Sequence, residues 1–168
     1  MILLRSPAPE DISTIKDWPP YPTEFRDLDY ALRDEGWLDD YLHKTGAEIL
    51  VAEEAGEIAG FSIIDREPDG SAEFRIALHP GKLGKGFGKA IMLHSLSYGF
   101  SDPETRRIRL IVRKNNSRAK RLYENLHFRK TGECSEEIQG KPVEFFRMEI
   151  DRNTFYRELN DERSTTCY

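Results

Sequence analysis

A run of alternate glycines, Gly84, Gly86 and Gly88, joins a strand pattern to an apolar helix pattern. Glycine has no Cβ, so the main chain of such a run can approach a bound ligand closely. The free N–H groups and the dipole at a helix start favour an anion. Nearby positive charge comes from Lys82, Lys85 and Lys89. The run therefore predicts a site for a phosphate or pyrophosphate group.

The glycine run does not fit two other phosphate-binding motifs. In a Walker A loop a lysine follows the last glycine, whereas here Phe87 follows Gly86. In a dinucleotide-binding fingerprint the third glycine comes one residue later than Gly88, and the motif opens a βαβ unit. A tight turn between a strand and a helix, without any ligand, is the alternative that the run alone leaves open.

The order of the predicted elements indicates an α/β (α+β) fold with a mixed sheet. Short turns between consecutive strands predict an antiparallel meander, and one strand–helix–strand segment makes the sheet mixed. We expect about seven strands, mostly antiparallel, flanked by about four helices. The strands are expected at residues 2–5, 47–53, 57–65, 71–80, 107–113, 128–138 and 143–150, and the helices after Pro9, near 37–42, from the glycine run to about Gly99, and after Asn116. Residues 1–159 are expected to form one domain, with 160–168 as a polar, disordered tail.

Length and composition narrow the class of protein. The 168 residues are 33% charged and carry a formal net charge of −5, which argues against nucleic acid as a partner. No secretory signal or membrane-spanning stretch is expected, and hence no membrane partner. Cys134 and Cys167 have no metal-binding spacing. We therefore expect a cytoplasmic protein with no structural disulfide and no metal.

Two separate motifs resemble those of the GNAT superfamily of acyl-CoA N-acyltransferases. The segment Leu78–Lys89 is similar to the family's pyrophosphate-binding motif, and Asn116–Phe128 is similar to its Asn-x-x-Ala-x-x-Leu-Tyr…Gly-Phe motif. The resemblance covers residues 2–150 and includes the expected element order. Two positions depart from it: Leu83 replaces the usual Gln or Arg, and His127 replaces a glycine. The resemblance implies a GNAT-like fold and an N-acetyltransferase.

The resemblance also implies acetyl-CoA as the co-substrate and assigns the residues that bind it. The pyrophosphate would bind main-chain N–H groups, and the pantetheine arm would pair with the strand that ends at Leu78. A main-chain N–H near Leu78 would polarise the thioester carbonyl. Asn116 would bond the pantetheine amide. The expected cofactor-binding residues are Leu78, Leu83, Gly84, Lys85, Gly86, Phe87, Gly88 and Asn116.

Two residues are the main catalytic candidates. The resemblance assigns Tyr123 as the general acid that protonates the leaving thiolate, and a simple apolar-face tyrosine is the alternative. Glu73 is the candidate base for the amine, directly or through water, and a solvated strand carboxylate is the alternative. His79 is a second candidate base or a turn residue. Ile111 stands where some relatives that act on protein N-termini have a glutamate.

The acceptor is expected to be a small-molecule amine or an amine of a peptide or protein. The segment that shapes the acceptor site in the family is here acidic and aromatic, which suits a cation. Its acidic residues are Glu24, Asp27, Asp29, Asp34, Glu35, Asp39 and Asp40, and its aromatic residues are Trp18, Tyr21, Phe25, Tyr30 and Trp37. A solvated acidic surface is the alternative. A domain that senses acetyl-CoA without turnover also remains open, as does a homodimer.

Overall fold

The computed structural model describes residues 1–159, so the predicted tail at 160–168 lies outside the described residues. The strands are β1 (Leu3–Arg5), β2 (Ala47–Glu54), β3 (Glu57–Arg66), β4 (Ser71–Leu78), β5 (Arg107–Arg113), β6 (Arg129–Ile138) and β7 (Lys141–Asp151). The α-helices are α1 (Pro9–Lys16), α2 (Trp37–Leu42), α3 (Phe87–Ser101), α4 (Ser117–Asn125) and α5 (Arg152–Glu158). Two 3₁₀ segments, η1 (Thr23–Leu32) and η2 (Pro80–Lys82), complete the described elements.

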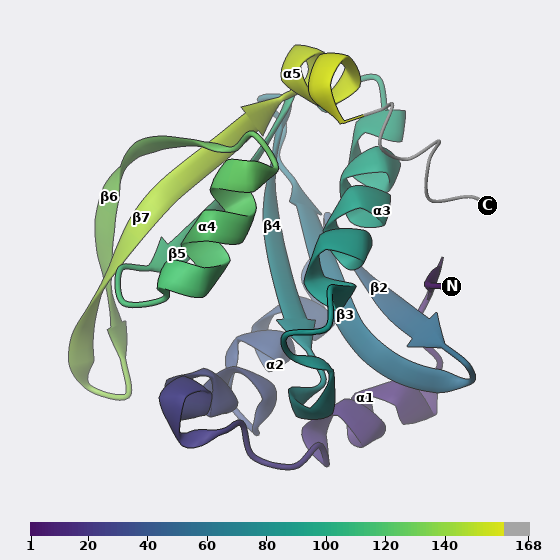
Figure 1. The fold of residues 1–168 in the computed structure, drawn as a ribbon, viewed down its shortest axis with the longest axis vertical. Helices are drawn as coiled ribbons and strands as arrows, with labels where there is room; N and C mark the ends of the chain where they lie inside the picture. The colour runs from purple at the N-terminus through teal and green to yellow at the C-terminus, as the bar shows by residue number, and fades with distance from the viewer. Residues whose placement is uncertain (160–168) are drawn as a thin grey trace. The chain divides into compact units, whose positions relative to one another are not determined.

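The strands form a mixed, mostly antiparallel sheet in the order β1-β2-β3-β4-β5-β7-β6 (Figure 1). The parallel pair is β4 with β5, and this pair is joined through α3 as the strand–helix–strand segment predicted. The expected fold class is confirmed, with one additional helix, α5. Asp151 caps α5 by accepting a hydrogen bond from the Thr154 N–H at 2.7 Å.

The described chain divides into two compact units. The first contains Met1–Arg66 and Arg75–Ser95, and the second contains Glu67–Phe74 and the residues from Leu96 onward. The prediction of one domain over residues 1–159 stays a prediction.

In the first unit, β1 pairs with β2 and β2 with β3, all antiparallel. The unit's aromatic core includes Trp18, Tyr21, Tyr41 and Phe61, all nearly excluded from solvent. These side chains come from the helical N-terminal segment and from β3, so burial of their apolar surface holds that segment in place. No regular α-helix forms over the proline-rich stretch, which instead contains η1.

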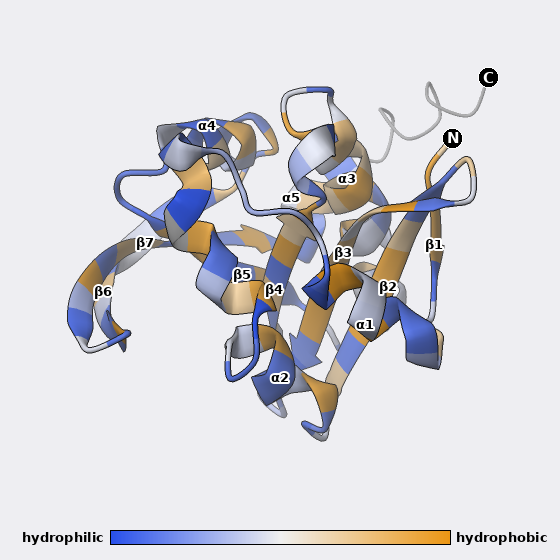
Figure 2. Ribbon diagram, turned by 90° about the horizontal axis from the view of Figure 1, so that it is seen from below, coloured by the Kyte–Doolittle hydropathy of each residue, from blue (hydrophilic) through white to orange (hydrophobic). Residues whose placement is uncertain are grey.

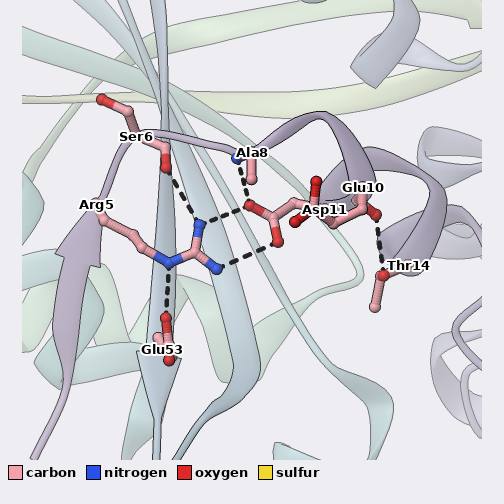
Figure 3. Close-up of polar contacts among 7 residues, drawn as sticks. All are labelled: Arg5, Ser6, Ala8, Glu10, Asp11, Thr14 and Glu53. Atoms are coloured by element: carbon pink, nitrogen blue, oxygen red, sulfur yellow. Dashed lines mark hydrogen bonds and ion pairs between the residues drawn. The ribbon is translucent and has the colours of Figure 1, made fainter.

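A polar cluster ties β1, α1 and β2 together in the first unit (Figure 3). Arg5 donates to Glu53 from Nε at 2.6 Å and to Asp11 from Nη1 at 2.6 Å and from Nη2 at 3.2 Å. Asp11 also accepts the Ala8 main-chain N–H at 2.5 Å, so it satisfies a free donor at the start of α1. The Arg5 guanidinium lowers the pKa of the Asp11 carboxyl. The nearly buried carboxylate is therefore held in its charged form.

In the second unit, β5 pairs with β7 and β7 with β6, all antiparallel. The β6–β7 hairpin is the long curved ribbon at the left of Figure 1. Seven residues of β6 are exposed, and its charged residues colour much of the strand blue in Figure 2. Ile108, Leu110 and Val112 of β5 are buried, and they alternate with less buried residues as the sequence pattern predicts.

Arg152 closes the C-terminal end of α3 in the second unit. Its Nη1 donates to the main-chain carbonyls of Phe100, Asp102 and Thr105 at 2.6, 3.2 and 3.2 Å. Phe100 lies in the last turn of α3, so its carbonyl has no partner within the helix and the guanidinium supplies one. The Asp102 carbonyl, beyond the helix, also accepts the Thr105 N–H at 3.1 Å. Within the described residues, no helix is long and apolar enough to cross a membrane.

Candidate functional site

The glycine run forms a turn that leads directly into α3. Gly84 has φ +74° and Gly86 has φ +84°, and both values lie in the left-handed region that favours glycine. A Cβ built on Gly86 would meet nothing within 4 Å, so the space above this main chain is open. Gly88 is buried within the first turn of α3. The run thus presents exposed main chain at a helix start, which is the geometry expected of an anion-binding loop.

The side chains around this loop have distinct environments. Lys82 Nζ lies 3.7 Å from Glu54 Oε2 and 5.2 Å from the centre of the Phe87 ring, whereas Lys85 is exposed. Leu83 is partly buried and packs against the aromatic core of the first unit. Leu83 therefore anchors the loop by apolar packing. This packing is a physical reason for leucine at a position where the family motif has Gln or Arg.

His79 fixes the turn that precedes the loop. Its Nδ1 accepts the Gly81 N–H at 2.9 Å, and its own main-chain N–H donates to the Ala59 carbonyl of β3 at 2.9 Å. The ring makes an edge contact with Trp18 at a centroid distance of 5.1 Å. Burial, and secondarily Lys82, lowers the pKa of His79, which favours the neutral ring that this hydrogen bond requires. These contacts favour the turn-residue interpretation of His79 over the base.

Sequence reasoning missed Tyr21 as a partner of the predicted donor-binding strand. The Tyr21 hydroxyl donates to the Leu78 carbonyl at 2.5 Å. Tyr21 is 3% exposed, and burial raises the pKa of its phenol well above the usual range. The two residues are 57 positions apart in sequence, so no local pattern links them. The one signal in the sequence was an aromatic residue between two prolines.

Asn116, in the second unit, caps α4, which begins where the sequence predicts a helix. Its Oδ1 accepts the Ala119 N–H at 3.2 Å. The side-chain amide N–H groups take no part in that bond, so they could still donate to a ligand. Its predicted contact with the pantetheine arm stays a prediction.

Tyr123 lies in the last turn of α4, and its side chain is nearly buried, at 8% exposure. Burial raises the pKa of its phenol to about 12. Among the described residues nothing accepts a hydrogen bond from its hydroxyl. The phenol is therefore a neutral proton donor at physiological pH, as a general acid must be.

The end of α4 explains the second departure from the family motif. His127 has φ +67°, and the N–H groups of His127 and Phe128 donate to the carbonyls of Glu124 and Tyr123, both at 3.0 Å. This is the Schellman pattern of helix ends, in which glycine usually occupies the left-handed position. The histidine is therefore a turn residue under backbone strain.

Glu73 is partly buried in β4, in register with Arg109 of β5. The expected strand position is confirmed, and the base role stays a prediction. The predicted site residues fall into two groups. Leu78 and the loop residues 83–88 lie together in the first unit, and Glu73, Asn116 and Tyr123 belong to the second unit.

Some of the acidic side chains expected to receive a cation have partners within the chain. Lys16 pairs with Asp34 at 3.0 Å and with Asp39 at 2.6 Å. Asp29 lies 3.6 Å from Arg33 and also accepts the Tyr21 main-chain N–H at 2.9 Å. These three carboxylates thus have cationic partners, although the side chain of Asp34 remains 91% exposed. Glu24, Glu35 and Asp40 are exposed as well.

Aromatic rings of this segment already contact a cationic side chain of the chain itself. The Arg75 guanidinium lies 5.3 Å from the Trp37 ring centre and 5.4 Å from that of Tyr41. Arg75 Nε also donates to the Tyr41 hydroxyl at 3.0 Å. Within residues 1–159, no cluster of three or more His, Cys, Asp or Glu side chains could hold a metal ion.

The profile of the acetyltransferase (GNAT) family matches residues 13–128, which include the glycine run and the whole of α4. The chain therefore belongs to the GNAT acetyltransferase family. The predicted resemblance and the predicted acyltransferase class are confirmed. The comparisons lend no support to the alternative of a sensor without turnover.

Two curated relatives are spermidine N(1)-acetyltransferases. The protein from Vibrio cholerae is 37% identical over 82 residues, which are 48% of this chain and 47% of the relative. The protein from Escherichia coli K12 is 30% identical over 124 residues, which are 71% of this chain and 67% of the relative. The aligned part of this chain thus spans about half of the first relative and two thirds of the second.

Two solved structures share the fold over nearly the whole chain. Mutant forms of the spermidine/spermine N-acetyltransferase SpeG from Vibrio cholerae have a TM-score of 0.74 at 23% identity, covering 95% of this chain and 99% of that one. A dodecameric structure of spermidine N-acetyltransferase from Vibrio cholerae has a TM-score of 0.71 at 25% identity, covering 94% and 96%. The fold class predicted from sequence is therefore confirmed.

Proposed function

We propose that the chain transfers an acetyl group from acetyl-CoA to a primary amine of a small polyamine, by direct attack within a ternary complex. The observation that carries this proposal is the glycine loop, which opens α3 with two left-handed glycines and unobstructed space above Gly86. Exposed main-chain N–H groups at a helix start suit a pyrophosphate. Family membership supports CoA as the ligand that carries this pyrophosphate.

The donor would be held by main-chain groups in the first unit. The N–H groups of Gly84 to Gly88 would bind the pyrophosphate, and the exposed Lys85 would add charge near it. The end of β4 at Leu78 would pair with the pantetheine arm, and a main-chain N–H there would polarise the thioester carbonyl. Asn116 would donate its side-chain amide to the arm.

The chemical step needs an acid and a base. The amine nitrogen forms a bond to the acetyl carbon while the carbon–sulfur bond breaks, so the sulfur leaves as a thiolate. Tyr123 would give this thiolate its proton. With a pKa of about 12, the phenol is still protonated when the thiolate leaves. Glu73, directly or through a water molecule, would take the proton that the amine loses.

A polyamine is the acceptor class that the relatives favour, since both curated relatives are spermidine N(1)-acetyltransferases. The exposed carboxylates Glu24, Glu35 and Asp40 lie in the acidic N-terminal segment and could attract a polycation. The ion pairs of Asp29, Asp34 and Asp39 leave fewer free charges than the sequence implied. We therefore expect the exposed carboxylates to contribute most.

We further infer that the protein works in the cytoplasm and that copies of it associate. Cys134 is a free thiol, which suits a reducing compartment. A relative with 25% identity forms a dodecamer, which supports association of this chain as well. Sedimentation of the purified chain would measure its oligomeric state directly.

A thiol-release assay with acetyl-CoA tests the proposed reaction. The panel of acceptors contains spermidine, spermine, aminoglycosides, free amino acids, and peptides with a free N-terminus or lysine. We expect thiol release that depends on spermidine or spermine and shows little response to the other amines. Release with peptides or amino acids alone would reject the polyamine assignment, and no release with any amine would reject the transferase.

A matched pair of variants tests the glycine loop in the same assay. Gly86→Asn and Gly86→Asp place side chains of nearly equal size at the same left-handed position, and both carry its backbone strain. Only the aspartate adds a negative charge beside the proposed pyrophosphate site. We expect Gly86→Asp to bind acetyl-CoA about tenfold more weakly than Gly86→Asn. Equal affinities would remove the phosphate-loop assignment.

A further inference from the structure

We propose that Tyr21 is a positioning residue that orients the end of β4 for the pantetheine arm of the acyl donor, through the hydrogen bond between its hydroxyl and the Leu78 carbonyl. This inference rests on the proposed function, because it assumes that β4 receives the donor. It adds a side chain from the N-terminal segment to a strand end whose own proposed contacts with the donor are main-chain groups.

The direction of the Leu78 carbonyl follows from its neighbour. The His79 N–H reaches the Ala59 carbonyl of β3 at 2.9 Å. Successive residues of a strand direct their main-chain polar groups to opposite edges, so the N–H and carbonyl of Leu78 point to the edge away from β3. That edge is where an added strand, or a pantetheine arm, would make its hydrogen bonds. The Tyr21 hydroxyl therefore bonds the carbonyl of the residue proposed to receive the donor.

Tyr21 is held firmly enough to orient another group. Its main-chain N–H donates to Asp29 Oδ1 at 2.9 Å, and its carbonyl accepts from Arg26 Nε at 3.0 Å. Proline precedes and follows it, which restricts the main chain on both sides. Its ring is buried in the aromatic core of the first unit.

The neighbouring contacts reinforce the same strand end. Trp18, three residues before Tyr21, makes an edge contact with the His79 ring at 5.1 Å. The Nδ1 of His79 in turn accepts the Gly81 N–H. The segment from Trp18 to Tyr21 thus contacts two consecutive residues at the point where the strand gives way to the glycine loop. Loss of the Tyr21 hydroxyl should loosen the strand end while the packing of Trp18 and His79 remains.

The role predicts a selective loss of affinity. A hydroxyl that orients the strand end affects a ligand with a pantetheine arm and leaves a ligand without the arm unaffected. A purely structural hydroxyl would affect both ligands or neither. Acetyl-CoA and 3′-phospho-ADP, the fragment of CoA without the arm, form the required pair of probes.

The experiment measures binding of both probes by calorimetry to the wild-type chain and to Tyr21→Phe, which keeps the buried ring. Tyr156→Phe is the matched control, because the Tyr156 hydroxyl donates to the Phe100 carbonyl at 3.3 Å outside the donor loop. We expect Tyr21→Phe to weaken acetyl-CoA binding about three- to tenfold, as loss of one neutral hydrogen bond would. Binding of 3′-phospho-ADP should stay within error of wild type, and Tyr156→Phe should bind both probes like wild type. The thermal unfolding midpoint of Tyr21→Phe should fall by about 2–4 °C, because a nearly buried hydrogen bond is lost.

Each other outcome overturns the inference. Equal weakening of both probes would give the hydroxyl a general structural role. Unchanged affinity for acetyl-CoA would leave it without a role in donor binding, and tighter binding would make it a competitor of the arm. A wild-type chain that binds neither probe would instead reject the proposed function itself, so the two failures are distinguishable.

Discussion

The ring of Phe128 lies 6.0 Å from the ring of Tyr123, and together the two residues close the C-terminal end of α4. The Phe128 N–H also donates to the Tyr123 carbonyl at 3.0 Å, so the two residues contact each other through both their main chains and their rings. Such an apolar contact commonly accompanies the Schellman motif. The proposed acid is therefore held by the structure that ends its own helix, and its ring has little freedom to turn.

We expect Tyr123→Phe to lower turnover by roughly 100-fold, because the thiolate would then leave without a proton donor. Acetyl-CoA affinity should change little, since the ring and its packing on Phe128 are kept. Steady-state kinetics and calorimetry measure the two quantities separately. Unchanged turnover would assign Tyr123 to packing alone.

The raised pKa of Tyr123 gives this variant a pH test. A phenol with a pKa of about 12 is protonated, and so competent as an acid, at every pH below that value. Activity should therefore not fall between pH 8 and roughly 10, where an unperturbed tyrosine begins to ionise. A basic limb in that range that disappears in Tyr123→Phe would show that the phenol ionises in the range and that its pKa is lower.

We expect His127→Gly to stabilise the protein by about 1 kcal/mol. The residue has φ +67°, and glycine adopts this conformation without a Cβ clash. Chemical denaturation measures the free energy of unfolding, and the same gain should raise the unfolding midpoint by about 2–4 °C. His127→Ala is the control, because alanine keeps the Cβ and should give no gain. A loss of stability in His127→Gly would mean that the histidine side chain has a stabilising contact of its own.

The Asp11–Arg5 contact predicts how the first unit responds to acid. Arg5 holds the pKa of Asp11 below its ordinary value of 3.8, so the contact contributes stability above that pH and loses it as the pH falls through the lower folded value. Asp11→Asn should cost about 2 kcal/mol at neutral pH, because Arg5 loses a charged partner. The difference from wild type should shrink below pH 4.

Denaturant titrations at a series of pH values follow this difference. Glu10→Gln is the matched control, since Glu10 is an exposed carboxylate on the same helix and its side chain has no ion pair among those found within residues 1–159. It should change stability little at any pH. A cost for Asp11→Asn that stays constant down to pH 3 would contradict the charged state assigned to Asp11.

Local patterns were enough to predict most of the fold. The apolar residues of β5 alternate with polar ones, because burial of one face of a strand gives its sequence a period of two. Turn residues mark the start of β4, and both signals predict strand bounds to within a few residues. The helix start after Asn116 and the replacement of a glycine by His127 were also visible in the sequence, since each depends on neighbours a few residues away. The short helix α5 was missed, although Asp151 and Thr154 carry its cap.

Contacts between distant residues could not be predicted in this way. The hydroxyl of Tyr21 meets the carbonyl of Leu78 only because the N-terminal segment packs on the end of β4. The pairing of Lys16 with Asp39 and the position of Arg75 on Trp37 depend on the same packing. Sequence composition therefore overstated the negative charge that this segment offers to a cation.

The strand β6, at one end of the sheet order, bears on how the protein behaves when it is concentrated. An edge strand of this length presents main-chain donors and acceptors that a second chain could extend into a shared sheet. Here both faces carry exposed charged residues: Lys130, Glu133 and Glu137 share one face, and Arg129 and Glu136 lie on the other. The register also shifts between Lys130 and Gly132. A neighbouring strand would have to desolvate these charges and match an irregular edge. Fibrous self-association through β6 is accordingly disfavoured, and storage at high concentration should not seed it.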